Sequence, residues 1–228
     1  MGSPHGSNVW QKNKLTMFGA HCPFIPLDQL AESKVIRIYF GRGHDFLDSV
    51  LKRAYLDFNR TLHGIGQQPD RGGIYEKQAE ILKGKLEILC GQARISQPQF
   101  DQWHQYTCQA LIDGYRKYGF RLYIGQAQKW INMSLKYIYT LGEERVPGFM
   151  ELYPLCHIPL DRIMLKALES YGLPRMNKPW TRMDNYKEYL DIQIWVRKRF
   201  DLPPLDVEFL LWQGKIIPME SKSAMKAV

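Results

Sequence analysis

Two side chains in the second half of the sequence have the types and spacing needed for covalent chemistry. Lys129 lies near the start of an apolar helix expected over residues 125–141, and Asp161 follows 32 residues later at the start of another helix. Burial among aromatic residues destabilises an ammonium ion, which favours the neutral, nucleophilic amine. A carboxylate beside it can accept the amine's proton or stabilise positive charge that develops on a substrate. The sequence therefore predicts a lysine nucleophile with an aspartate partner.

Each of these residues also has a purely structural interpretation. The side chain of Lys129 could extend along apolar surface and keep its ammonium group in water. Asp161 could be an acidic residue of the first helical turn, where the helix dipole favours a negative charge. Residues 157–160 (His-Ile-Pro-Leu) support a helix that starts at this point, because proline suits a helix start and restricts the residue before it.

The helix that carries Lys129 has an unusual composition. Residues 123–139 read YIGQAQKWINMSLKYIY, with large apolar side chains around most of the helix circumference. A helix that is apolar on nearly all sides lies at the centre of a fold. Lys136 lies on the same face two turns after Lys129, and it is the second candidate for the nucleophile.

These motifs resemble the helix-hairpin-helix superfamily of DNA glycosylases. The Lys-Trp-Ile-Asn-Met-Ser-Leu-Lys-Tyr helix at 129–137 and the His-Ile-Pro-Leu-Asp-Arg turn at 157–162 are most similar to its archaeal 8-oxoguanine glycosylase branch. That branch also has an acid four residues before a tryptophan near its C-terminus, as Glu208 and Trp212 are here, although its acid is an aspartate. The resemblance covers residues 120–214.

The resemblance implies an enzyme that flips a damaged or modified base out of double-stranded DNA and excises it. Lys129 would attack C1′ of the sugar and form a Schiff base, after which the strand can be cleaved, while Asp161 would assist as base and as negative charge. Glu208 and Trp212 would contact the extruded base. The base could be 8-oxoguanine or another modified base, including one that marks phage DNA, so that the role is DNA repair or antiviral defence. No metal and no cofactor is implied.

Basic residues supply candidate contacts to DNA phosphates. The net charge of +8 and the pI of about 9.2 favour a polyanionic partner. Arg197, Lys198 and Arg199 cluster on one predicted helix, and Arg121 precedes the central helix. Such clusters release counterions from DNA and make binding depend on salt. A solvated helix face has the same composition.

Helical patterns dominate the chain and predict an all-α fold with two helical lobes around a cleft. The predicted helices cover residues 46–62, 74–90, 98–118, 125–141, 160–171, 183–200 and 205–213. Residues 35–40 (VIRIYF) are the best strand candidate, with the start of a helix as the alternative. We interpret residues 1–7 (MGSPHGS) as an expression remnant and residues 8–228 as a single domain.

Several protein classes are disfavoured by missing motifs. The sequence contains no P-loop, no dinucleotide-binding glycine motif and no metalloprotease or serine-hydrolase motif. It has no run of 18 apolar residues and no paired cysteines that could hold zinc. Without a secretion signal we expect a cytoplasmic monomer with free thiols. The alternative function is that of a non-catalytic α-helical nucleic-acid-binding protein.

Overall fold

The computed structural model describes residues 29–41, 45–92 and 94–217, and over these residues the fold is all-α, as predicted. The α-helices are α2 (Gln29–Phe40), α3 (Phe46–Phe58), α4 (Arg71–Cys90), α5 (Gln97–Arg116), α6 (Ile124–Leu141), α7 (Arg162–Glu169), α8 (Tyr186–Arg199) and α9 (Pro204–Trp212). Short 3-10 helices are η2 (Asn59–Thr61), η3 (Ile65–Gln67), η4 (Met150–Leu155) and η5 (Trp180–Arg182). The predicted expression remnant lies outside the described residues.

The predicted helices from α3 to α9 are confirmed, with ends that shift by a few residues. The strand predicted over residues 35–40 is wrong, because this segment is helical; it forms the second half of α2 and not the start of a helix that the alternative proposed. The described part of the chain offers no strand for it to pair with. A helix satisfies the backbone N–H and C=O groups within the segment itself, whereas an unpaired strand leaves them open.

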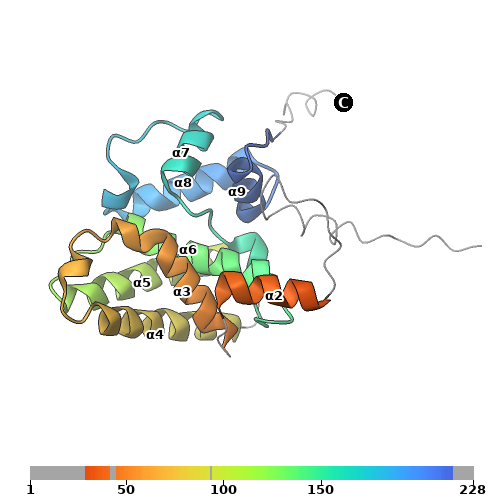
Figure 1. Ribbon diagram of the computed structural model, residues 1–228. Helices are drawn as coiled ribbons and strands as arrows, with labels where there is room; N and C mark the ends of the chain where they lie inside the picture. The colour runs from red at the N-terminus through yellow and green to blue at the C-terminus, as the bar shows by residue number, and fades with distance from the viewer. Residues whose placement is uncertain (1–28, 42–44, 93, 218–228) are drawn as a thin grey trace, which may run out of the picture. The chain divides into compact units, whose positions relative to one another are not determined.

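Backbone contacts divide the chain into two units, Met1–Tyr39 and Phe40–Val228. The described part of the first unit is most of α2. The second unit carries every candidate site residue. Within it, Figure 1 shows α3 to α6 in one layer and α7 to α9 in another, joined by the chain that runs from α6 to α7. Among the described helices none is both long and apolar enough to cross a membrane.

Helix α6 lies at the centre of the second unit. It contacts α3 and α5 in its own layer, and α8 and η5 on its other side. Every residue from Ile124 to Ile138 is buried. Trp130 is fully buried, where its ring stacks on Phe58 at 5.3 Å and its indole N–H donates to the Leu51 carbonyl at 3.0 Å. The central position predicted from the apolar circumference of this helix is confirmed.

The start of α6 is held in place by close backbone packing. The N–H of Gly125 donates to the Met183 carbonyl at 3.0 Å. A Cβ atom at this glycine would lie 1.8 Å from the carbonyl oxygen of Trp180 in η5. Only glycine lets the two backbones approach this closely. The contact fixes the first turn of α6, one turn before Lys129.

Candidate active site

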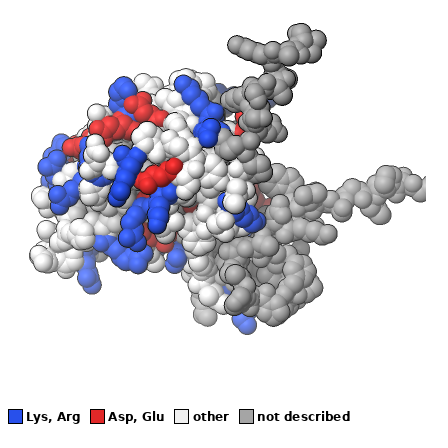
Figure 2. All heavy atoms as spheres, turned by 90° about the horizontal axis from the view of Figure 1, so that it is seen from above, with Lys and Arg blue, Asp and Glu red and all other residues white. Residues whose placement is uncertain are grey.

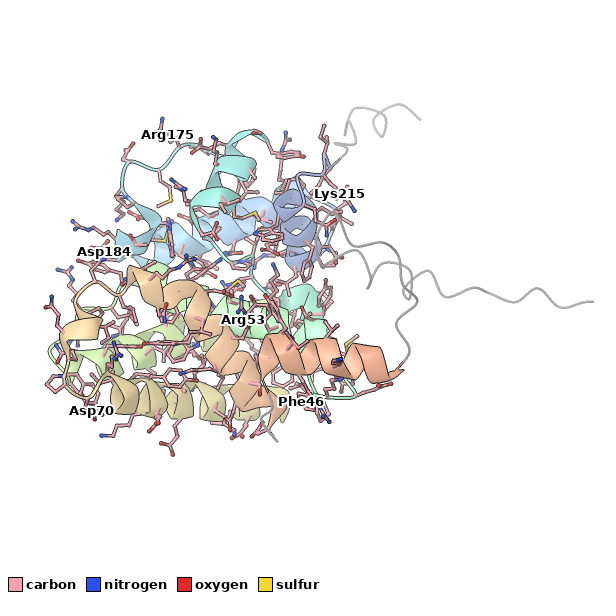
Figure 3. All side chains as sticks on the ribbon, in the orientation of Figure 1. Phe46, Arg53, Asp70, Arg175, Asp184 and Lys215 are labelled. Atoms are coloured by element: carbon pink, nitrogen blue, oxygen red, sulfur yellow. The ribbon has the colours of Figure 1, made fainter. Side chains whose placement is uncertain are left out.

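Lys129 pairs with Asp161 between the two layers of the second unit. Its side chain is 9% exposed, and its Nζ lies 2.7 Å from Asp161 Oδ2. The ammonium group therefore meets a carboxylate and does not extend into bulk water. The two residues singled out for chemistry are brought together, although they come from different helices. Figure 3 shows that side chains from the two layers fill the space between the layers.

The sequence predicted Asp161 as an acidic residue of the first turn of a helix. In the structure it is instead the N-cap of α7, one residue before that turn. Its Oδ1 accepts a hydrogen bond from the Met164 N–H at 2.9 Å, which satisfies one of the free amides at the helix start. Its Oδ2 accepts from Lys129. One oxygen is thus used by the helix and the other faces the amine, so the orientation of the carboxylate is fixed.

The electrostatics of the pair follow from these contacts. Burial raises the pKa of Asp161, but the Lys129 ammonium and the backbone N–H groups of Met164 and Ile163 outweigh burial and hold this pKa below its usual value. The carboxyl group is therefore ionised near neutral pH. The Asp161 side chain is 23% exposed, so solvent reaches the pair from the aspartate side. Lys129 Nζ and Asp161 Oδ2 lie within proton-transfer distance, and the lowered pKa of Asp161 favours the ion pair as the resting state.

A second buried ion pair lies further along the same face of α6. Lys136 Nζ lies 2.8 Å from Glu208 Oε1 and 2.6 Å from Oε2, and the two side chains are only 11% and 3% exposed. Glu208 Oε2 has no hydrogen-bond partner apart from this ionic contact. The second candidate nucleophile is therefore bound to the residue that we expected to contact a base.

Aromatic rings of α9 surround the second pair. The Lys136 ammonium lies 4.7 Å from the ring centre of Phe209 and 5.5 Å from that of Trp212. These distances allow cation–π attraction. Trp212 itself is 60% exposed, so its indole is available to a ligand. Of the four residues expected at the site, Glu208 is closed off by Lys136 and Trp212 is open.

A buried polar network beside the pair was not predicted. The imidazole of His157 lies between the Asp101 carboxylate, 2.8 Å from Nε2, and the Tyr189 hydroxyl, 2.9 Å from Nδ1. Because a carboxylate only accepts, Nε2 of the neutral ring carries the proton and Nδ1 accepts from Tyr189. The amide of Asn132 on α6 then donates to the Tyr189 oxygen at 2.8 Å. The sequence signal that could have indicated this network is the presence of polar residues such as Asn132 within the otherwise apolar α6.

This network has consequences for charge. Burial lowers the pKa of His157, and the Asp101 carboxylate opposes that shift only in part. Burial raises the pKa of Asp101, but His157, Gln97 and Arg197 reverse the effect and bring it to about 2. The Arg197 guanidinium reaches Asp101 Oδ2 at 3.1 Å. A residue expected to bind DNA phosphate is thus engaged inside the protein.

The other predicted phosphate contacts remain on the surface. Lys198 and Arg199 are exposed at the end of α8, where Arg199 Nε also donates to the Tyr171 carbonyl at 3.0 Å. Arg121 is exposed and lies 4.6 Å from the ring centre of Tyr123. Figure 2, seen from the side of α7 to α9, shows Lys and Arg side chains spread over this face with Asp and Glu between them.

Other features of the described residues lie away from the pair. A cavity of about 400 Å³ opens between α3, η3 and the start of α4, and its lining includes Lys52, Tyr55, Arg71 and Tyr75. Neither Lys129 nor Asp161 lines it. Across residues 29–41, 45–92 and 94–217 no group of His, Cys, Asp and Glu side chains could hold a metal ion. The described cysteines are free thiols: Cys90, Cys108 and Cys156.

Comparison with protein-family models, with curated proteins and with solved structures finds no match to this chain. The geometry of the two ion pairs therefore carries the functional argument together with the sequence motifs.

Proposed function

We propose that this protein is a DNA glycosylase that excises a damaged or modified base from double-stranded DNA and then cleaves the strand at the abasic site. The observation that carries the proposal is the 2.7 Å contact between Lys129 Nζ and Asp161 Oδ2. It joins the two residues that the glycosylase-like motifs single out, at the start of α6 and at the start of α7. The amine and its proton acceptor are in direct contact, as nucleophilic catalysis requires.

The reaction follows from the chemistry of this pair. Lys129 transfers a proton to Asp161, and its neutral amine attacks C1′ of the flipped nucleotide. The bond between C1′ and the base breaks, its electron pair leaves with the base, and the base takes the proton from Asp161, which becomes a carboxylate again. The amine nitrogen, now bonded to C1′, gives a proton to the ring oxygen as the bond between C1′ and that oxygen breaks. Opening of the sugar ring gives a Schiff base between Lys129 and C1′. Loss of a proton from C2′ then expels the 3′ phosphate, and water releases the lysine. The Asp161 carboxylate stabilises the positive charge on the sugar.

The second pair supplies the candidate base subsite. The exposed indole of Trp212 offers a stacking surface, and stacking contributes about 1–3 kcal/mol per base. Glu208 is closed off by its ion pair with Lys136, so its Oε2 can accept a hydrogen bond from a ring N–H or an amino group only when that pair opens. A base that bears such donors would insert beside α9. Exposed cations, including Lys198, Arg199 and Arg121, would contact the phosphates.

The test is base release from duplexes that each carry one modified base. The panel includes 8-oxoguanine, deaminated, alkylated and hypermodified bases. The proposal predicts release of at least one of them, with strand cleavage, and a strong loss of release in Asp161→Asn. This variant retains an N-cap oxygen for α7, so the helix start is preserved. Tight duplex binding with no release from any member of the panel would favour a non-catalytic nucleic-acid-binding protein.

A further inference from the structure

Gln128 links the segments that carry the two residues of the ion pair. It is the neighbour of Lys129 on α6 and is fully buried. The Leu160 N–H donates to Gln128 Oε1 at 3.1 Å, and Gln128 Nε2 donates to the Leu160 carbonyl at 2.7 Å. Leu160 directly precedes Asp161. The residue next to the lysine thus holds the residue next to the aspartate by two hydrogen bonds.

The amide of Gln128 is itself held in one orientation. Its Oε1 also accepts from Asn132 Nδ2 at 3.0 Å, and its Nε2 also donates to the Gly125 carbonyl at 2.8 Å. Asn132 is bound in turn to the Tyr189 hydroxyl at 2.8 Å. All of these side chains are buried, so rotation of the Gln128 amide would leave donors and acceptors unpaired in a site of low dielectric constant.

We propose that Gln128 is a positioning residue that sets the geometry of the Lys129–Asp161 pair. Its amide fixes the backbone of Leu160 against the first turns of α6. Asp161 Oδ1 is fixed separately by the start of α7, so these two constraints together place Oδ2 against the lysine amine. The catalytic consequence of this role rests on the proposed function, whereas the effect on the ion pair does not.

The chain offers a matched control two residues earlier on the same helix. Gln126 is also buried, and its amide also binds backbone groups. Its Nε2 donates to the Thr61 carbonyl at 2.7 Å, and its Oε1 accepts from the Tyr123 N–H at 3.1 Å. Gln126 holds η2 and not the segment before Asp161. Removal of either amide should cost stability, more so for Gln128 with its four hydrogen bonds, but only removal of Gln128 should disturb the ion pair.

The experiment compares Gln128→Met and Gln126→Met in two measurements. The first uses no DNA: reductive methylation with formaldehyde and cyanoborohydride is followed by peptide mass spectrometry, which gives the labelling rate of Lys129. We expect about a tenfold faster rate in Gln128→Met, the size of effect expected when a hydrogen bond to a charged group is lost. Gln126→Met should label as the wild type does. If Gln128→Met does not fold, Gln128→Asn, whose shorter amide cannot reach Leu160, takes its place.

The second measurement is the single-turnover rate of base excision as a function of pH. Gln128→Met should lower this rate and move its acidic limb to higher pH, because Asp161 loses part of the contact that lowers its pKa. Its affinity for duplex DNA should stay unchanged. Wild-type labelling of Lys129 in Gln128→Met, or equal acceleration in Gln126→Met, would overturn the positioning role. Faster labelling only in Gln128→Met, with no excision by any protein including the wild type, would uphold that role and reject the glycosylase.

Discussion

The buried pair of Lys136 and Glu208 allows a quantitative prediction about what joins α6 to α9. Substitution Lys136→Met leaves Glu208, which is 3% exposed, without a counter-ion. Removal of one partner from a buried ion pair costs about 3–5 kcal/mol. For a chain of this size 1 kcal/mol corresponds to about 2–4 °C in Tm, so Lys136→Met should lower the Tm by about 6–20 °C.

The reverse substitution should cost less. In Glu208→Leu the remaining ammonium keeps its aromatic neighbours Phe209 and Trp212 and is 11% exposed. Cation–π attraction of about 1–2 kcal/mol offsets part of the penalty of about 3–5 kcal/mol, which leaves a loss of about 1–4 kcal/mol. The double variant Lys136→Met/Glu208→Leu removes both charges and should lie within about 1 kcal/mol of the wild type.

Urea titration of the four proteins, followed by tryptophan fluorescence and circular dichroism, measures these differences. The pattern of two destabilised single variants and one restored double variant is the signature of a coupled buried pair. A Lys136→Met variant with the wild-type urea midpoint would refute the stabilising role of this pair. That role would also be refuted by a double variant that loses the sum of the two single losses, because the side chains would then act independently.

Three further predictions concern single positions. Because the folded-state pKa of Asp161 is lowered, its contribution to stability is present above its ordinary pKa of 3.8 and is lost as the pH falls through the folded value. The unfolding free energy of the wild type should therefore exceed that of Asp161→Asn at pH 7, and this difference should shrink below pH 4. Parallel urea titrations measure it, and a difference that stays constant with pH would contradict the prediction. Gly125→Ala should lower the Tm strongly because the added Cβ meets a carbonyl oxygen of η5. The Cβ added by Gly84→Ala in α4 meets nothing within 4 Å, so this control should raise stability by about 0.5–1 kcal/mol. Equal effects of the two substitutions in thermal melts would argue against the close approach at η5. Lys198→Ala should reduce the slope of log DNA affinity against log salt concentration by about 1 and leave the Tm unchanged. Arg197→Ala should instead lower the Tm, because it breaks the ion pair with Asp101. The opposite pattern would mean that Arg197 is the phosphate contact.

Much of the fold could be predicted because the signals are local. Apolar spacing, the serine before α5 and the glycines after α6 and α7 mark the helices. The strand assigned to residues 35–40 failed because a β-branched and aromatic run is compatible with both structures, and the choice depends on whether a neighbouring strand exists. That information lies elsewhere in the fold.

Of the candidate site, only the pairing of Lys129 with Asp161 could be predicted. The spacing of Lys129 and Asp161 suggested that they pair, whereas the partner of Lys136 lies 72 residues away and carries no local signal. The same holds for the contact of the part-buried Arg197 with Asp101, which occupies a cation that we expected to bind DNA phosphate. Long-range pairing of charged residues is decided by packing between helices, and no periodicity encodes it.

Trapping of the covalent intermediate tests the central claim most directly. The protein is incubated with borohydride and a duplex that carries the excised base, and the adduct is digested and mapped by mass spectrometry. We expect the sugar to be attached to Lys129, no adduct in Lys129→Ala, and far less adduct in Asp161→Asn than in the wild type. An adduct at Lys136, or base release that persists in both Lys129→Ala and Asp161→Asn, would contradict it.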